Sequence, residues 1–110
     1  MVFDRFSIVN VPFPFTNLVE FKKRKALVLS NREFNTKNEC TVLAMITSAE
    51  RSSWAGDVTI DQWKEVGLRK PCLVRLKLFT IENSFLLEKI GELQTNDRLV
   101  FQKQFESYLS

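Results

Sequence analysis

Alternating apolar and polar residues indicate that most of this chain forms short β-strands. Between Ser7 and Phe13, the side chains of Val9, Val11 and Phe13 fall on one face, as the two-residue period of a strand requires. Similar apolar runs recur along the chain, and polar residues, glycine or proline separate them. We therefore expect further strands at about 25–31, 40–48, 58–60, 72–81 and 85–93.

Helical patterns are confined to two places. Asp61 can cap a brief helical turn that Gly67 closes, whereas the polar stretch 32–39 is expected to be a turn between strands. A terminal helix is expected from Thr95 or Asn96 onward, with an apolar face made by aromatic residues at spacings of four and three. Those residues are Phe101, Phe105 and Tyr108.

The order of these elements predicts the fold class. No segment between two strands is long enough for a crossover helix, which argues against alternating parallel units. A mainly β, strongly bent barrel or half-barrel with a C-terminal α-helix fits the pattern best. Residues 1–110 contain no repeat or linker, so we expect one domain, long enough to bury a modest core.

Charge and composition exclude some kinds of catalytic and metal sites but do not identify a partner. The chain has 16 basic and 13 acidic residues and a net charge of +3, which is compatible with a polyanionic partner without requiring one. It has no histidine, which excludes imidazole acid–base catalysis and mixed histidine–cysteine zinc sites. We expect no metal and no cofactor.

The cysteines and the hydropathy pattern bear on where the protein works. Cys40 and Cys72 lack the spacing of a metal or redox motif, and we expect both to be reduced. No signal peptide is recognisable, and no apolar stretch approaches the roughly 18 residues that span a bilayer. We therefore expect a cytoplasmic protein with no membrane partner.

Polar residues at strand ends are the candidates for function. A basic turn precedes the second strand, and within it Arg24 can make two-point, charge-assisted bonds to a phosphate. Thr47 and Ser48 end the third strand, where a hydroxyl can bind a phosphate oxygen, and Arg75 and Lys77 share a face of the long strand. The other cations of the turn are Lys22, Lys23 and Lys25.

Each of these features also has an ordinary structural explanation. A basic turn can be a solvated loop, the two hydroxyls can simply terminate a strand, and Arg75 and Lys77 can be the outward half of an alternating strand. Phe13 and Phe15 share parity with Val9 and Val11, which predicts core positions. Trp54, in a polar segment, is the better candidate for an exposed ring that stacks on a base.

Taken together, the segments resemble the MazF/PemK toxins of type II toxin–antitoxin systems. The resemblance runs through nearly the whole length, and its most specific parts are VPFPFT, KKR-x-ALV and AMITS in that order. The remaining segments that carry it are GDV, GLRKPCLVRL and IGEL.

The resemblance implies an SH3-like barrel of the CcdB/PemK type that works as a homodimer. It implies a metal-independent endoribonuclease that cleaves single-stranded mRNA and is neutralised by a cognate antitoxin. By position in the motifs, the catalytic arginine is Arg24 and the catalytic threonine is Thr47. The strand arginine that some members use is Arg75. Lys22, Lys23, Lys25, Ser48 and Lys77 are further candidates for RNA contacts.

The chain departs from the family pattern at four places. Phe6-Ser7 replaces the usual Gly-Asp, Lys25 replaces a proline, and Cys72 replaces a serine. Lys77 stands where some members carry an acidic residue, which removes a candidate acid or base. Glu20 is the nearest replacement for it. These departures leave open an alternative, in which a degenerate barrel acts by binding a protein or RNA without cleavage.

Overall fold

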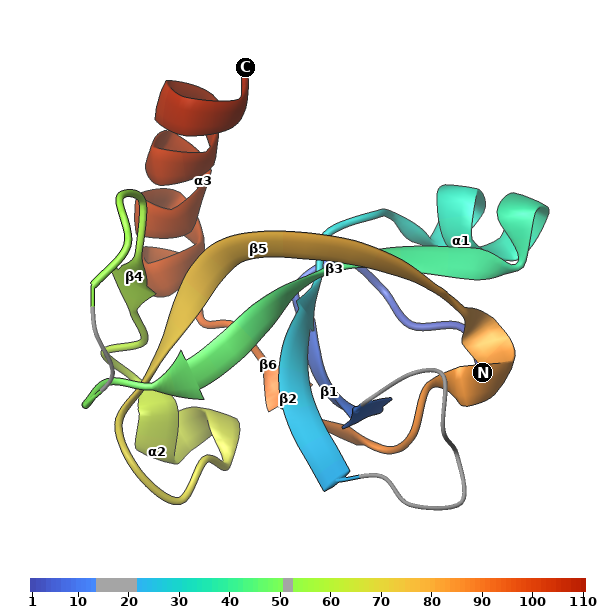
Figure 1. Ribbon diagram of the computed structural model, residues 1–110, viewed down its shortest axis with the longest axis horizontal. Coiled ribbons are helices and arrows are strands. Elements are labelled where there is room, and N and C mark those ends of the chain that lie inside the picture. The colour runs from blue at the N-terminus through green and yellow to red at the C-terminus, as the bar shows by residue number, and fades with distance from the viewer. Residues whose placement is uncertain (14–21, 51–52) are drawn as a thin grey trace.

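The computed structural model describes residues 1–13, 22–50 and 53–110 of the chain. Its strands are β1 (Ser7–Phe13), β2 (Lys22–Val28), β3 (Cys40–Ser48), β4 (Val58–Thr59), β5 (Cys72–Glu82) and β6 (Lys89–Glu92). Its helices are α1 (Arg32–Asn38), α2 (Trp63–Val66) and α3 (Thr95–Leu109), with a 3₁₀ turn η1 (Asn83–Phe85) (Figure 1).

The described strands form one antiparallel sheet in the order β4-β5-β3-β2-β1-β6. The long strand β5 arches over β3, and the sheet curls so that α3 and α1 lie at opposite ends of it (Figure 1). The β3–β5 ladder shifts register between Ala44 and Met45, and such a bulge sharpens the local bend. The predicted mainly β half-barrel with a terminal helix is confirmed.

Apolar side chains are buried on both faces of the curled sheet. One cluster contains Ile8, Leu27, Ala44 and Ile46, and Phe101 of α3 packs into it. The other contains alternate residues of the same strands, including Val9, Val11, Ala26, Val28 and Leu43. Because successive strand residues point to opposite faces, these two clusters show which face each polar side chain occupies.

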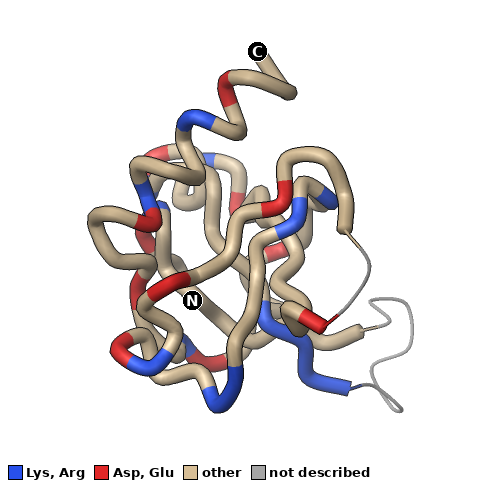
Figure 2. The backbone as a smooth tube through the Cα atoms, turned by 90° about the vertical axis from the view of Figure 1, so that its left-hand side faces the viewer, with Lys and Arg blue, Asp and Glu red and all other residues tan. Residues whose placement is uncertain are grey.

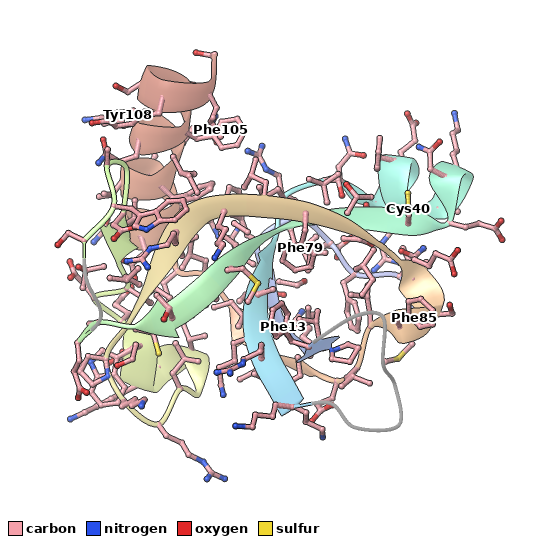
Figure 3. All side chains as sticks on the ribbon, viewed as in Figure 1. Phe13, Cys40, Phe79, Phe85, Phe105 and Tyr108 are labelled. Atoms are coloured by element: carbon pink, nitrogen blue, oxygen red, sulfur yellow. The ribbon has the colours of Figure 1, made fainter. Side chains whose placement is uncertain are left out.

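The terminal helix packs through fewer of its aromatic residues than predicted. Phe101 is fully buried, and its ring centroid lies 6.4 Å from that of Phe6 and 5.8 Å from that of Phe105. Tyr108 is 54% exposed, so the prediction of a three-residue apolar face is wrong for the last position. Phe105 and Tyr108 follow one another up the helix in Figure 3.

Phe6 has a left-handed backbone, with φ of 72°, just before β1. This conformation is unfavourable for a bulky residue. The ring is held in place by Phe101 and by the guanidinium carbons of Arg5 and Arg98, which lie 4.6 and 5.0 Å from its centroid. Packing therefore maintains a conformation that glycine would adopt freely.

Several predicted boundaries need correction. The stretch expected to be a polar turn contains helix α1, which Asn31 caps by accepting a 2.9 Å hydrogen bond from the Phe34 backbone N–H. Strand β2 begins and ends three residues earlier than predicted, because its first half pairs with β1. Of the strand expected at 85–93, only the stretch named β6 above has strand structure, since η1 and an irregular segment precede it.

Two single-residue predictions are also wrong. Asp61 does not cap α2; instead Asp97 of α3, which is buried, accepts hydrogen bonds from the backbone N–H groups of Asp61 and Gln62. Phe13 is 45% exposed and not in the core, because the β1–β6 ladder ends at Val9. Phe15 lies outside the described residues.

Candidate functional site

Arg24 and Thr47 occupy corresponding positions on neighbouring strands. The β2–β3 ladder ends with Ala26 opposite Met45, and Arg24 and Thr47 are the next residues of the same face on each strand. Arg24 is exposed and Thr47 is half-buried. Within the described residues the Arg24 side chain makes no hydrogen bond or ion pair.

The four cations that begin β2 divide between the two faces of the sheet. Lys22 and Arg24 share parity with Ala26 and therefore with the face that carries Thr47. Lys23 and Lys25 share parity with Leu27 and point to the opposite face. Figure 2 shows the four as a continuous basic stretch, but strand alternation makes only half of it part of one surface.

Lys23 is held by a carboxylate that the sequence did not suggest. Its ammonium lies 2.9 Å from Glu88 Oε1, which also accepts a 3.0 Å hydrogen bond from the Asn10 amide. The hydrogen bond from Lys23, with smaller contributions from the Glu88 backbone and Asn10, lowers the pKa of Glu88 to about 2. Glu88 therefore stays charged at neutral pH, which favours an ion pair over a role in proton transfer.

Ser48 and Lys25 belong to the face opposite Thr47. Ser48 pairs with Cys72, which lies in the cluster around Ile46. Burial raises the pKa of the Cys72 thiol, while the nearby charge of Lys25 acts in the opposite direction. Both cysteines are free, as predicted. The structure thus separates Ser48 from Thr47, although they are adjacent in sequence.

Arg75 lies on the same face as Thr47, one strand further across the sheet. It pairs with Met45, and its guanidinium makes two hydrogen bonds to Asp57, of 3.1 Å from Nε and 2.9 Å from Nη2. The two side chains are only 11% and 13% exposed. Burial alone would raise the pKa of Asp57. The hydrogen bonds from Arg75 and from the Trp54 backbone outweigh this effect, so the pKa lies below its ordinary value. Arg75 is therefore anchored.

Lys77 and Trp54 lie next to Arg75. The Lys77 ammonium lies 5.6 Å from the centroid of the Trp54 ring, and the guanidinium carbon of Arg75 lies 5.2 Å from it. Trp54 is 45% exposed, as the sequence predicted. Glu20, the candidate acid or base, lies outside the described residues.

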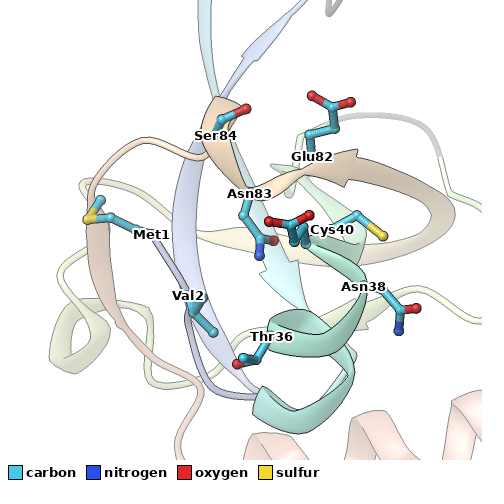
Figure 4. A pocket seen from close by; sticks show the side chains of 9 residues that line it. Met1, Val2, Thr36, Asn38, Cys40, Glu82, Asn83 and Ser84 are labelled. Atoms are coloured by element: carbon cyan, nitrogen blue, oxygen red, sulfur yellow. The ribbon is translucent and has the colours of Figure 1, made fainter.

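One open pocket of the described residues lies elsewhere. It is an open hollow of about 760 Å³ at the first residues of β3, near Cys40 (Figures 3 and 4). Thr47 and Ser48 are the last two residues of that strand. It contains none of the residues that the sequence selected. Its lining comes from the N-terminus, α1 and the end of β5: Met1, Val2, Thr36, Asn38, Glu39, Cys40, Glu82, Asn83 and Ser84.

A comparison with protein families identifies the chain. The model of the PemK-like, MazF-like toxins of type II toxin–antitoxin systems matches residues 4–107. The chain belongs to this family. No curated protein matched the sequence.

Solved structures of MazF toxins have the same fold as this MazF-like chain. It is similar to a MazE–MazF complex from Deinococcus radiodurans, with 18% identity, a TM-score of 0.76 and coverage of 100% of this chain and 97% of that one. A Mycobacterium tuberculosis MazF toxin has 21% identity, a TM-score of 0.71 and coverage of 92% and 93%. A mycobacterial endoribonuclease in complex with its cognate antitoxin has 13% identity, a TM-score of 0.75 and coverage of 96% and 91%.

Two carboxylates that pair with candidate residues were not identified from the sequence of this MazF-like chain. Asp57 could be found only by knowing that β4 pairs with β5, which brings it to Arg75 across 18 positions of sequence. Glu88 reaches Lys23 across 65 positions, in a segment that was expected to be strand. Within the described ranges, no group of three or more acidic or cysteine side chains could hold a metal ion. None of the described helices is long and apolar enough to cross a membrane.

Proposed function

We propose that this toxin is a metal-independent endoribonuclease that cleaves single-stranded mRNA. The observation that supports the proposal is the position of Arg24 and Thr47 on one face, immediately beyond the last paired residues of β2 and β3. A guanidinium and a hydroxyl on one face match the needs of a phosphodiester better than those of a neutral substrate.

In the proposed reaction the RNA supplies its own nucleophile. The ribose 2′-oxygen attacks the adjacent phosphorus and forms a new P–O bond, while the bond from phosphorus to the 5′-oxygen breaks. The products are a 2′,3′-cyclic phosphate and a 5′-hydroxyl. The 2′-hydroxyl loses a proton and the departing 5′-oxygen gains one. Glu20 is the candidate for one of these transfers.

Arg24 and Thr47 would act on the charge that develops during this step. The guanidinium would donate hydrogen bonds to the phosphoryl oxygens, and the Thr47 hydroxyl would add a neutral donor. Preorganised donors of this kind typically contribute about 10²–10³ in rate each. Arginine is too weakly acidic to serve as a general base, so we assign Arg24 to charge stabilisation.

The remaining basic residues would hold and attract the RNA. Lys22 shares the face of Arg24, and Lys77 lies further along the same surface. We propose that both contact phosphates directly. Lys23, Lys25 and Ser48 face the other side, so their contribution would be a long-range field or a contact with RNA that wraps the edge of β2.

The proposal also covers where the protein acts and what it assembles with. The protein would act in the cytoplasm as a homodimer, and a cognate antitoxin encoded separately would neutralise it. The related structures with a bound antitoxin support this partner.

The experiment is induced expression of the wild type and of Arg24→Ala, followed by mapping of RNA 5′ ends. Arg24→Ala should abolish growth arrest and cleavage. The matched control is Arg32→Ala, which removes an exposed arginine of α1 paired with Asp4. Cleavage by purified protein should persist in a chelator. Products with a 5′-phosphate would refute the mechanism, and equal growth arrest by wild type and Arg24→Ala would favour the non-catalytic alternative.

A further inference from the structure

The turn that leads into β4 presents an aromatic ring next to two cations. The Trp54 indole is 45% exposed, and it lies within 5.2 Å of the Arg75 guanidinium carbon and 5.6 Å of the Lys77 ammonium. An exposed aromatic ring beside positive charge is the combination by which proteins bind unpaired nucleotides, because every base has a face that can stack.

This turn is held rigidly before any ligand arrives. The Trp54 N–H donates a 2.8 Å hydrogen bond to Asp57 Oδ2, and the Asp57 N–H donates a 3.1 Å bond back to the Trp54 carbonyl. Gly56 has a φ of 89°, and a Cβ there would lie 2.7 Å from Leu76 Cδ1. A turn whose backbone is fixed in this way loses little conformational entropy on binding.

Arg75 connects the turn to the candidate catalytic residues. Through its ion pair with Asp57 it fixes the turn to β5, and through its pairing with Met45 it faces the same side of the sheet as Thr47. Strands β5, β3 and β2 are consecutive in the sheet, so the strands that carry Arg75 and Arg24 are separated by β3 alone. A single RNA strand can span that separation.

We propose that Trp54 stacks on an unpaired base of the RNA next to the cleaved bond. Lys77 then binds an adjacent phosphate. Arg75 is a positioning residue, because Asp57 neutralises its charge and its guanidinium orients the indole. This inference rests on the proposed endoribonuclease function, and it assigns to that site a binding residue outside the motifs that carry the family resemblance.

The test measures binding without turnover. A fluorescently labelled, randomised single-stranded 2′-O-methyl RNA cannot undergo 2′-attack, and its affinity is measured by anisotropy at low salt. Trp54→Ala should weaken binding about 10- to 100-fold, the range expected for loss of one base–aromatic stack. Trp54→Phe should retain most of the affinity. Phe34→Ala is the control, because it removes another exposed aromatic ring, on α1, and should bind like the wild type.

A second measurement reports on Trp54 itself. Trp63 is the other tryptophan of the chain, so Trp63→Phe leaves Trp54 as the single indole emitter. Its fluorescence should be quenched on addition of the 2′-O-methyl RNA. Unchanged affinity in a folded Trp54→Ala variant, or unquenched emission at saturation, would overturn the proposal. If Trp54→Ala lost binding of the antitoxin but kept binding of RNA, the proposal would also be overturned, in favour of a protein-binding role for Trp54.

The two proposals fail separately. If the wild type leaves unmodified RNA intact while Trp54→Ala still weakens binding of the 2′-O-methyl RNA, the cleavage mechanism is wrong and the stacking role stands. If the wild type cleaves RNA and Trp54→Ala binds normally, only the stacking role is wrong.

Discussion

Asp57 receives both a guanidinium and a backbone hydrogen bond, because Arg75 donates to its two oxygens at 3.1 and 2.9 Å and the Trp54 N–H donates at 2.8 Å. Asp57→Asn should therefore lower the urea midpoint of unfolding at neutral pH more than Asp61→Asn, which alters an exposed carboxylate. Adding Arg75→Gln to Asp57→Asn should recover part of the loss, because the unpaired cation is then removed. Additive losses would contradict this coupling.

The same ion pair predicts a pH dependence. The pKa of Asp57 lies lower in the folded protein than its ordinary value, so its contribution to stability is present above about pH 3.9 and is lost as the pH falls through the folded-state pKa. Urea unfolding at a series of acidic pH values should show a shallower loss of stability in Asp57→Asn than in the wild type. Identical slopes would show that the pair does not titrate in this way.

Thr47 and Ser48 offer a matched comparison of two hydroxyls on opposite faces. Thr47→Val preserves shape but removes the donor, and it should reduce the rate of RNA cleavage about 10²–10³-fold. Thr47→Ser should restore most of the activity, while Ser48→Ala should remain close to the wild type because that side chain faces away. Single-turnover cleavage of one RNA substrate measures all three. A greater loss from Ser48→Ala than from Thr47→Val would refute the assignment of faces.

Lys22 and Lys23 should differ in their effect on the salt dependence of RNA binding. Lys22→Ala removes a proposed phosphate contact, so the slope of log affinity against log salt concentration should become shallower by roughly 0.7. Lys23→Ala should leave that slope nearly unchanged, because Lys23 lies on the other face and pairs with Glu88. Equal changes in the two variants would indicate that RNA contacts both faces of β2.

The Lys23→Ala variant should also have an altered pKa at Glu88. Glu88 loses the hydrogen bond that contributes most to its low pKa of about 2, so that pKa should rise toward the ordinary glutamate value near 4.3. An NMR titration of the side-chain carboxyl group measures the pKa in both proteins. The control is Lys37→Ala, which leaves this cluster untouched on α1. A Glu88 pKa that stays near 2 would assign the effect to Asn10 and the backbone.

Phe6 combines an unfavourable backbone with favourable packing, and two variants separate these effects. Phe6→Ala and Phe6→Gly both lose the ring contacts with Phe101, but only glycine adopts a φ of 72° without penalty. Phe6→Gly should therefore be more stable than Phe6→Ala by about 1 kcal/mol in urea unfolding. The reverse order would show that the backbone relaxes when the ring is removed.

The sequence predicted those parts of the structure that depend on local alternation. The predicted bounds of β1 and β3 agree with the structure, as does the start of β5, because each strand has a continuous apolar pattern. Helix α1 was missed because six of its seven residues are polar and its one apolar residue, Phe34, is exposed, which leaves no helical period of apolar residues to detect. The partners of Lys23 and Arg75 were missed because they depend on which strands pair.

Strand alternation has a consequence for comparing variants of this protein. Exchanging Lys23 and Arg24 would leave the composition and the net charge of +3 unchanged. It would nevertheless move the guanidinium to the face of Glu88 and the ammonium to the face of Thr47, because the two positions face opposite sides of the sheet. Conservation of charge in this segment is therefore a poor guide to conservation of activity. What matters is which cation occupies position 24, because that position shares a face with Thr47.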